Sequence, residues 1–446
     1  MTRRTALRID GACVADAERA YSPGSLLLEL TDETPPVQGA IHARARVLAV
    51  GGPEDVAADA RGAGARVLDM RSHAVLPAFV NAHTHLDLTC VGPRAYDPAL
   101  GFGGFVEVVR AARPTSAEAI AASVRAGVEA SIRGGVAIVG DICGAVGGRA
   151  SAHAFEALRD SPLWGVGFLE FFAVGGSTPR AFAALREALE RAEAGGRTGT
   201  RVRPGVQPHA PYSVGIEGYA SAWDICRERG LAFATHLAET LEEREFVELG
   251  RGPRRAFLEQ IGLWDEHAAR EVGHGRSPIA HVARALGGWS PGDPPRVAAH
   301  VNDLGDDLGT LAAAKFAVVY CPRASAYFGA ERVMGAHRYR EMLAAGIPVA
   351  LGTDSVINLP EDARPLVLGV LDEARRLFSR DAVDAQTLLR MATVHGCAAL
   401  GISTAHALLG PGCEPAGIVG VPVGPSAGLS GVFAGSEPPA MLVLGK

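Results

Sequence analysis

The sequence predicts an α/β fold, a (β/α)8 barrel of the TIM type with a small β-sandwich domain formed from both termini. Eight short apolar runs alternate with helical stretches over roughly 280 residues, as such a barrel requires. Both ends of the chain show the period of antiparallel strands, with Pro, Gly and Asp at the turns. Several of the apolar runs also end in histidine or aspartate, at the strand ends where these barrels place their chemistry.

The terminal segments differ in texture from the middle of the chain. Residues 1–73 contain short alternating runs such as Ser25–Leu30 and Arg46–Val50, and residues 402–446 are rich in Gly, Pro and Val without a helical period. The 446 residues exceed a typical single domain, whereas α/β barrels reach about 250 residues or more as one unit. We therefore expect residues 1–73 and 402–446 to form the two parts of the β-sandwich domain, and residues 74–401 to form the barrel.

The barrel elements follow one another as strand, helix and turn. Thr115 to Glu118 has the pattern of a capping box and predicts the start of an amphipathic helix that runs to Ile132. Gly134 and Gly135 are expected to end this helix just before the next apolar run. The runs expected to form the eight strands begin at Val75, Val136, Val166, Val202, Ala232, Val297, Phe316 and Ile347.

Composition and charge exclude several classes of protein. The chain is 48% hydrophobic and 21% charged, which excludes a disordered chain, and its net charge of −6 without a basic cluster argues against a nucleic-acid partner. The seven cysteines form no C-x-x-C pair, so we expect neither a disulfide framework nor a cysteine zinc site. Without an apolar stretch for a signal peptide or a membrane span, we expect a cytoplasmic protein with a small-molecule substrate.

His83 and His85 close the first apolar run with one residue between them. Side chains at i and i+2 lie on the same face of a strand, so both imidazoles would point the same way. A neutral ring nitrogen binds Zn²⁺ at roughly 2.0–2.1 Å, and two such rings can share one ion. This spacing alone would also suit two surface or hydrogen-bonded histidines.

The ends of the later runs favour the metal. Metal-binding side chains follow the first, fourth, fifth, sixth and eighth runs, namely His83 and His85, His209, His236, His300 and Asp354. Three imidazoles and one carboxylate, from His83, His85, His236 and Asp354, make a shell for one divalent ion, with Zn²⁺ expected and Fe²⁺ as the alternative. A water on this ion would titrate near neutrality and act as a nucleophile.

Three residues are expected to be catalytic: Glu239, His300 and Asp354. Glu239 lies three residues after His236, placed to take a proton from the water and pass it to a leaving group. The alternative is an ordinary glutamate in the first turn of a helix. His300 would face Glu239 across the metal and orient the water or polarise a carbonyl-like group, unless it is a buried histidine bonded to the backbone.

Candidate substrate contacts come from other strand ends. His209 either contacts substrate or holds the Pro208–Pro211 loop in shape. Tyr212, Glu170, Arg323 and Tyr327 are further candidates, each with a purely structural role as the alternative. Cys321 is expected to be a packed thiol because no residue at a fixed spacing would activate it.

Together these segments resemble the amidohydrolase superfamily. The resemblance rests on six short motifs. They are the His83-Thr-His85 triplet after a strand that contains Leu-Pro, the PHAPYS sequence from Pro208, the THLAET sequence from Thr235, the single His300 before Val-Asn, the CPRASAYFG sequence from Cys321, and the LGTDS sequence from Leu351. It covers roughly residues 40 to 402 and is strongest to the branch of deaminases and chlorohydrolase-like enzymes, which includes enzymes acting on S-adenosylhomocysteine, methylthioadenosine, guanine and aminofutalosine.

The resemblance implies one metal held by His83, His85, His236 and Asp354, a proton-shuttling Glu239, and His300 as the sixth-strand histidine. Members with two metals usually bridge them with a carboxylated lysine on strand four. This chain has no lysine between His85 and Lys315, so a lysine-bridged pair of ions is excluded.

We therefore expect an aminohydrolase of an aminated purine or modified nucleoside, such as an aminofutalosine-like or S-adenosylhomocysteine-like adenosine derivative. Metal-bound hydroxide would attack the amidine carbon while Glu239 protonates the ring nitrogen. With Asp354 taking the proton of the water, Glu239 would then deliver a proton to the departing ammonia. The alternatives are hydrolysis of a cyclic amide or of a triazine-type halide or amine, and a catalytically silent binding barrel. Barrel enzymes of this kind often pair, which leaves a homodimer open.

Overall fold

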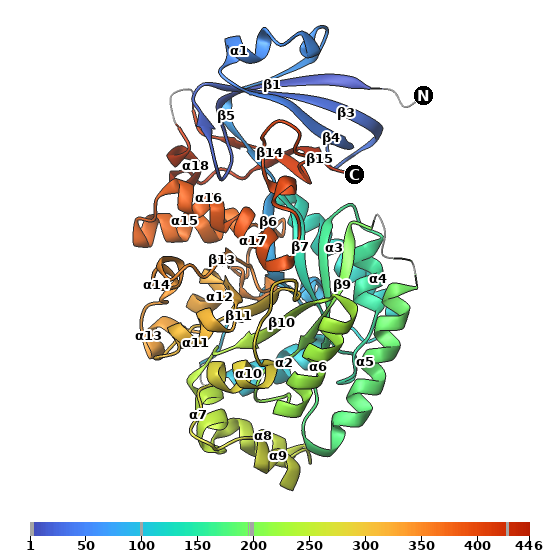
Figure 1. Ribbon diagram of the computed structural model, residues 1–446, viewed down its shortest axis with the longest axis vertical. Helices are drawn as coiled ribbons and strands as arrows, with labels where there is room; N and C mark the ends of the chain where they lie inside the picture. Colours follow the sequence, from blue (N-terminus) through green and yellow to red (C-terminus); the bar gives the residue numbers. More distant parts are fainter. Residues whose placement is uncertain (1–3, 99–100, 195, 197–199, 425–427) are drawn as a thin grey trace.

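The structure of the protein is a computed structural model that describes residues 4–98, 101–194, 196, 200–424 and 428–446. Figure 1 shows a smaller β-rich part that holds both chain ends and, below it, a larger part in which helices surround a second sheet. None of the helices in these ranges has both the length and the apolar character needed to cross a bilayer.

The larger part is an eight-stranded parallel barrel. Its strands lie side by side in chain order from β6 to β13. An isolated parallel bridge between Thr84 and Asp354 joins the last strand to the first. Every residue of β7, β10 and β11 is buried, as expected for strands covered on both faces. The strands are β6 (Phe79–Thr84), β7 (Val136–Cys143), β8 (Trp164–Phe171), β9 (Val202–Pro208), β10 (Ala232–Leu237), β11 (Arg296–His300), β12 (Phe316–Tyr320) and β13 (Val349–Leu351).

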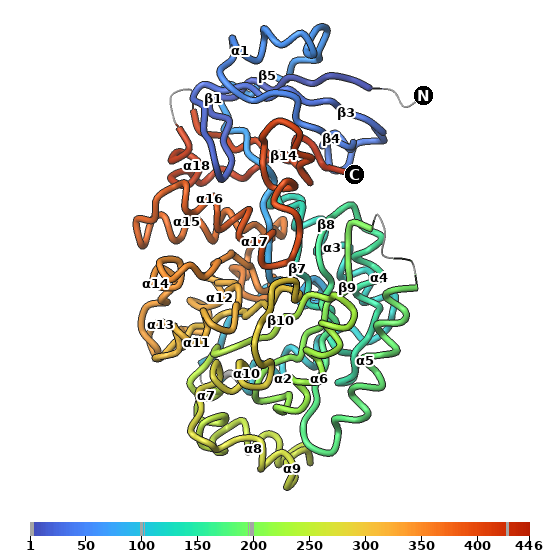
Figure 2. Tube along the Cα trace, in the orientation of Figure 1, coloured from blue at the N-terminus to red at the C-terminus, as the bar shows by residue number. Residues whose placement is uncertain are grey.

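The smaller part is a seven-stranded sheet in the order β2-β1-β3-β4-β15-β14-β5, which closes through a further pairing of β1 with β5. The two C-terminal strands lie between N-terminal ones, because β14 pairs with β5 and β15 pairs with β4. In Figure 2 the red C-terminal trace at β14 accordingly lies in the same part of the molecule as the blue N-terminal strands. Strands from both termini thus share one sheet. Its strands are β1 (Thr5–Ala15), β2 (Ala20–Tyr21), β3 (Gly24–Val37), β4 (Ala40–Gly51), β5 (Arg66–Pro77), β14 (Gly417–Pro422) and β15 (Ala440–Leu444).

Most helices follow barrel strands, whereas α1 follows β4 and α18 follows β14 of the smaller sheet. The early helices are α1 (Pro53–Ala57), α2 (Gly101–Ala112), α3 (Ala117–Arg133), α4 (His153–Arg159), α5 (Thr178–Glu193), α6 (Ile216–Arg229), α7 (Leu241–Leu249), α8 (Pro253–Gln260) and α9 (Glu266–Glu271). The later ones are α10 (Pro278–Leu286), α11 (Leu308–Ala313), α12 (Pro322–Tyr327), α13 (Ala330–Met334), α14 (Tyr339–Ala344), α15 (Val370–Asp381), α16 (Ala385–Met391), α17 (Val394–Leu400) and α18 (Ser430–Ala434).

The predicted fold class is confirmed, with two local differences. The first apolar run divides between the two sheets: Val75–Pro77 ends β5, and the barrel strand starts at Phe79. The backbone changes partner there, since Ala78 N–H donates to the Gly417 carbonyl at 2.8 Å. The expected capping box from Thr115 to Glu118 is wrong: the N-cap of α3 is Ser116, whose hydroxyl accepts from the Ala119 N–H, and Ala119 has no side-chain acceptor to complete a box.

Candidate active site

The closure of the barrel brings the first and last strand ends together. The carbonyl of His83 accepts the backbone N–H groups of Thr353 and Asp354, both at 3.1 Å. The N–H of His85 donates to the Asp354 carbonyl at 2.7 Å. The backbone of Asp354 is left-handed, with a φ of 60°. These bonds place the side chains of His83, His85 and Asp354 next to one another, although Asp354 lies far from the histidines in the sequence.

The side-chain distances fit one tetrahedral ion. His85 Nε2 lies 3.4 Å from Asp354 Oδ1 and 3.4 Å from His236 Nε2, and His83 Nε2 lies 3.9 Å from the same carboxylate oxygen. Ligand atoms that bind Zn²⁺ tetrahedrally at roughly 2.0–2.1 Å are about 3.4 Å apart. His300 also has a ring nitrogen within 4.8 Å of those of His83 and His236. His83, His85 and Asp354 thus form one cluster of possible ligand atoms within 4.8 Å, and His236 Nε2 adjoins it through His85.

The electrostatics of the four side chains suit a cation. Burial lowers the pKa of His83 and His85 well below the usual value, and the neighbouring histidines lower it further. Neutral imidazoles are the form that binds metals. The Nδ1 atom of His236 lies 3.0 Å from the His209 carbonyl, which leaves its Nε2 for an ion. Burial raises the pKa of Asp354 to about 8 in the absence of an ion, and a bound dication would favour the ionised form.

Glu239 lies outside the helix that follows it. Helix α7 starts at Leu241 with Thr240 as its N-cap, and the buried carboxylate of Glu243 accepts the N–H groups of Ala238 (2.7 Å) and Glu239 (3.0 Å). The helix start is thus satisfied by other residues, and the Glu239 side chain lines the cavity. Burial is the main cause that raises the Glu239 pKa.

His300 faces Glu239. Its Nε2 atom lies 3.6 Å from Glu239 Oε1, and burial lowers its pKa to about 4. The His300 backbone is left-handed with a φ of 72°, and Ala238 before Glu239 is also left-handed at 52°. Such conformations are costly for residues with a side chain and often occur at functional sites. The His300 carbonyl lies 2.8 Å from His337 Nε2, which helps to hold this conformation.

A cavity of about 830 Å³ opens next to the ligand cluster. Helices α2 and α8 supply much of its wall, and its lining is mainly apolar. A volume of this size accommodates a drug-sized molecule rather than a single ring. Apolar residues of the wall include Phe105, Val109, Phe172, Phe257 and Leu258.

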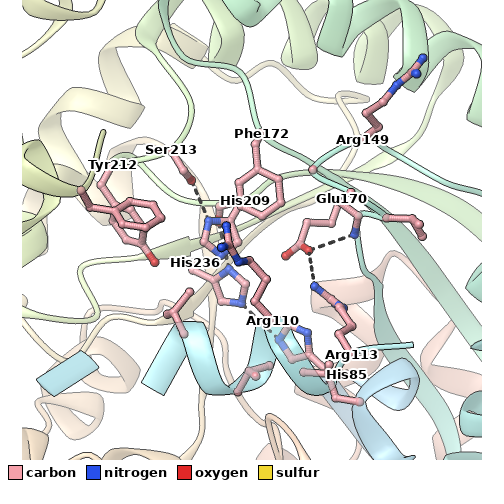
Figure 3. Close-up of a pocket in the computed structure, with 18 of the residues that line it drawn as sticks. His85, Arg110, Arg113, Arg149, Glu170, Phe172, His209, Tyr212, Ser213 and His236 are labelled. Carbon is pink, nitrogen blue, oxygen red and sulfur yellow. Dashed lines mark hydrogen bonds and ion pairs between the residues drawn. The ribbon is translucent and has the colours of Figure 1, made fainter. Parts of the chain in front are cut away.

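The structure brings three of the five expected substrate contacts to this cavity, namely His209, Tyr212 and Glu170. Figure 3 shows these residues around the cavity with His236 and His85. The Nδ1 atom of His209 lies 2.7 Å from the Ser213 hydroxyl, so this histidine both faces the cavity and holds its loop. The Tyr212 ring lies under the Arg254 guanidinium at 4.2 Å.

The structure does not bring Arg323 and Tyr327 to the cavity wall. The Arg323 guanidinium donates to Asn358 Oδ1 at 2.8 Å and pairs with the buried carboxylate of Glu373 at 3.2 Å. The Tyr327 hydroxyl donates to the Arg94 carbonyl at 2.9 Å. Cys321 is a buried thiol whose pKa is raised well above its usual value by burial, as expected for a packed cysteine.

Sequence reasoning missed several polar residues of the cavity. Arg110, Arg113 and Arg149 line it, and Arg113 forms an ion pair with Asp87 at 2.8 Å. Asp87 lies only two residues after His85, so its position next to a predicted metal ligand could have marked it as a residue near the site. The arginines follow none of the eight runs expected to form strands, so the strand-end rule could not find them.

Histidine and aspartate side chains at the carboxyl ends of the strands of a parallel barrel are typical of metal-dependent barrel hydrolases. The chain belongs to the amidohydrolase family, whose model matches residues 74–418. It is 32% identical over 352 residues to an aminodeoxyfutalosine deaminase of Deinococcus radiodurans, with 74% of each chain covered. It is 29% identical over 348 residues to a 5-methylthioadenosine/S-adenosylhomocysteine deaminase of Haloarcula marismortui, which covers 75% of this chain and 70% of that one.

Solved structures share the whole fold. The aminofutalosine deaminase of Helicobacter pylori in complex with methylthio-coformycin superimposes with a TM-score of 0.73 at 18% identity, covering 96% of this chain and 97% of that one. The atrazine chlorohydrolase of Arthrobacter aurescens complexed with zinc gives a TM-score of 0.66 at 19% identity, covering 94% and 87%. The family and the deaminases among its relatives confirm the predicted resemblance and a hydrolase that acts on carbon–nitrogen bonds. Members of this family bind a divalent metal.

Proposed function

We propose that the protein is a hydrolytic deaminase that releases ammonia from an aminated purine or modified nucleoside, such as an aminofutalosine-like or S-adenosylhomocysteine-like adenosine derivative. The observation that carries the proposal is the placement of Glu239, with its carboxylate 3.6 Å from His300 in the wall of the cavity that the ligand cluster adjoins. The deaminases among the relatives support the nucleoside-like substrate.

The metal in this proposal is Zn²⁺, held by His83, His85, His236 and Asp354. The fit rests on three donor-atom distances of 3.4 to 3.9 Å, which join His85 to Asp354, His85 to His236 and His83 to Asp354, and on the lowered pKa of the buried imidazoles. When bound, the ion acts as a Lewis acid and lowers the pKa of water to about 7. Zn²⁺ has no redox role and prefers nitrogen and oxygen ligands of this kind, although the same ligands also bind Fe²⁺.

Glu239 moves the protons in this proposal. A buried carboxyl with a raised pKa exchanges a proton more readily near neutrality than an exposed one. The Asp354 carboxylate takes one proton of the attacking water. The Glu239 carboxyl group gives a proton to the ring nitrogen next to the reacting carbon, then takes the hydroxyl proton of the adduct and passes it to the leaving amine. The proton on Asp354 finally returns to Glu239, so both protons of the water end on the products. His300 is neutral at pH 7 because burial lowers its pKa to about 4, so it orients the water by a hydrogen bond.

Size and walls of the cavity favour a nucleoside over a bare ring. A purine alone would leave much of the 830 Å³ unfilled, whereas a nucleoside with an apolar substituent would pack against α2 and α8. We propose a small-molecule substrate and no nucleic acid partner. The cytoplasmic location and the homodimer stay predictions from the sequence, the latter open to a light-scattering measurement.

Ammonia release tests this function. Protein with a measured metal content is incubated with adenosine, S-adenosylhomocysteine, methylthioadenosine, guanine, cytosine and triazines, and ammonia is followed by a coupled assay. We expect turnover of an adenosine derivative with about one metal per chain. Release of chloride from a chlorotriazine, or opening of a cyclic amide without ammonia from a nucleoside, would move the assignment to the corresponding alternative. A metal-loaded protein that transforms none of these compounds would contradict the proposal.

A further inference from the structure

His300 stands at the centre of a tight three-residue turn at the end of β11. The N–H of Val301 donates to the Ala299 carbonyl at 3.2 Å, and the φ of 72° at His300 matches the rare γ-turn whose central residue is left-handed. Val301 is also left-handed, with a φ of 50°, although its side chain is branched at Cβ. Such conformations are costly and persist only where surrounding contacts hold them.

Some of these contacts join the turn to the segment that carries Glu239. The N–H of Val301 also donates to the Leu237 carbonyl at 3.0 Å, and the side-chain amide of Asn302 donates to the Glu239 carbonyl at 3.2 Å. The turn and the end of β10 are therefore held to each other. None of these bonds uses the carbonyl of His300, which is free to accept a donor from elsewhere.

That donor is His337, which comes from the segment between α13 and α14 and is only 6% exposed. Its Nε2 atom lies 2.8 Å from the His300 carbonyl. Because a carbonyl only accepts, Nε2 carries the proton, and Nδ1 is the unprotonated nitrogen of a neutral ring. In the part of the chain that the structure describes, this Nδ1 atom has no hydrogen-bond partner. The bond to His300 therefore fixes the orientation of the ring edge.

Stacked tyrosines fix the faces of His337. The Tyr320 ring at the end of β12 lies almost parallel to it, with 3.7 Å between the ring centroids and 17° between the planes. Tyr339 stacks in turn on Tyr320 at 5.5 Å. The two hydroxyl groups donate to carboxylates, that of Tyr320 to Glu331 at 3.1 Å and that of Tyr339 to Asp381 at 2.7 Å. His337 is thus presented to the turn by a rigid stack of rings.

We infer that His337 is a positioning residue: its Nε2–H holds the His300–Val301 peptide in the left-handed turn and so keeps the His300 ring 3.6 Å from Glu239. Without this bond a buried carbonyl would lose its donor, and rotation of the peptide would relieve the strain of the turn. The His300 ring would then move with its backbone. This inference rests on the proposed deaminase function, in which His300 orients the water.

Two variants of equal side-chain length isolate the bond. His337→Gln keeps an N–H near the position of the ring Nε2, whereas His337→Met has no donor. For the nucleoside that the wild-type protein uses best, we expect His337→Met to lower kcat by roughly 10- to 100-fold, because a misplacement of about 1 Å costs about 10²-fold. KM should stay within about threefold, since His300 acts on the water, and His337→Gln should recover most of kcat.

His395→Met is the matched control. The Nδ1 atom of His395 also bonds a barrel carbonyl, that of Val349 at 3.0 Å, but Val349 begins β13 and so lies at the opposite end of the strand from the site. We expect this variant to keep the kcat of the wild type. A kcat of the His337→Met protein equal to that of this control would overturn the inference.

A double-mutant cycle separates positioning from packing. If His337 acts through His300, then His337→Met should lower kcat by less than about threefold further in a His300→Asn protein. Effects that multiply would show that His337 acts independently of His300, which would overturn the inference. Equal losses of kcat in His337→Met and His337→Gln, or losses in proportion to the bound metal, would show a packing role and overturn it as well.

Crystal structures of the wild type and of His337→Met supply a readout that does not depend on the reaction. We expect the variant to lose the φ of 72° at His300 and to move its ring away from Glu239. A His300 ring that stays 3.6 Å from Glu239 in the variant would overturn the inference for any substrate. If the wild-type protein deaminates no nucleoside, the proposed function fails, and the two structures still decide the role of His337.

Discussion

Replacing Glu239 by glutamine changes one atom of the site and removes its ability to carry a proton. The structure indicates that the variant will fold, because the N–H of residue 239 is held by Glu243 at 3.0 Å and the helix start does not depend on the Glu239 side chain. Glutamine has nearly the same shape and still reaches His300, which lies 3.6 Å from Oε1. The variant therefore isolates proton transfer from packing.

General acid–base catalysis by one side chain contributes roughly 10²- to 10⁴-fold. Glu239 is buried and its carboxylate lies beside His300, so we expect kcat for the best nucleoside to fall within this range. The corresponding rise in the activation free energy is about 3 to 5 kcal/mol. The metal content should stay at about one per chain, because Glu239 does not belong to the four predicted ligands.

The assay is ammonia release under saturating substrate, together with elemental analysis of the same samples. Glu245→Gln is the matched control, since Glu245 lies on α7 and forms an exposed ion pair with Arg251. We expect this control to keep wild-type activity. A Glu239→Gln protein that keeps more than about a third of its activity, against the expected loss of at least 10²-fold, would refute the role of Glu239. A loss of activity in proportion to a loss of bound metal would also refute the role of Glu239 in proton transfer.

The metal ligands and a buried carboxyl group provide three further predictions. His83→Ala should lose most of the bound metal and the activity with it, whereas His153→Ala on α4 should keep both, as elemental analysis and ammonia release will show. Removal of the metal by a chelator should lower Tm and abolish activity, and added Zn²⁺ should restore both, because an ion at 1,000 times its Kd stabilises the folded state by about 4 kcal/mol. Burial raises the pKa of Asp141 to about 8, so its contribution to stability is full below the unfolded pKa near 3.8 and is lost as the pH rises through 8. The Tm of Asp141→Asn relative to that of the wild type should therefore rise between pH 5 and 7, because the free energies of unfolding of the two proteins diverge by about 1.4 kcal/mol per pH unit. A Tm difference that does not depend on pH would contradict this.

The strand-end rule explains why the ligand candidates could be found in the sequence. His83, His85 and His236 follow apolar runs, and parallel strands place all their carboxyl ends on one side of the barrel. The fold class and the resemblance to the family were therefore accessible from the sequence alone. The roles of these side chains in binding the metal remain predictions that elemental analysis must test.

Local patterns could not show which strand pairs with which. Val75–Pro77 and Phe79–Thr84 form one continuous apolar run in the sequence, yet the first pairs with β14 from the other end of the chain. The division depends on contacts more than 300 residues apart in sequence, as the pairing of Val75 with Gly420 shows. Hydrophobic periodicity indicates the burial of a strand but not its neighbours.

Side chains of the cavity that lie in loops were the hardest to predict from the sequence. Arg113 lies after α2 and follows none of the eight runs expected to form strands, and its carboxylate partners come from two other segments. Conversely, Arg323 belongs to a segment that resembles the family, yet its guanidinium is bound to Asn358 and to Glu373 on α15. An arginine forms such pairs wherever the fold brings a carboxylate, which spacing along the chain does not reveal.

The central claim is that a water-derived oxygen replaces an amine of a nucleoside in this cavity. The most direct measurement is mass spectrometry of the product formed by the metal-loaded protein from an adenosine derivative in water labelled with heavy oxygen. We predict the inosine-type product with one labelled oxygen at the carbon that carried the amine, one ammonia per product, and no such product from Glu239→Gln in the same time. Recovery of unchanged adenosine derivatives from protein that carries its full metal complement would contradict the claim.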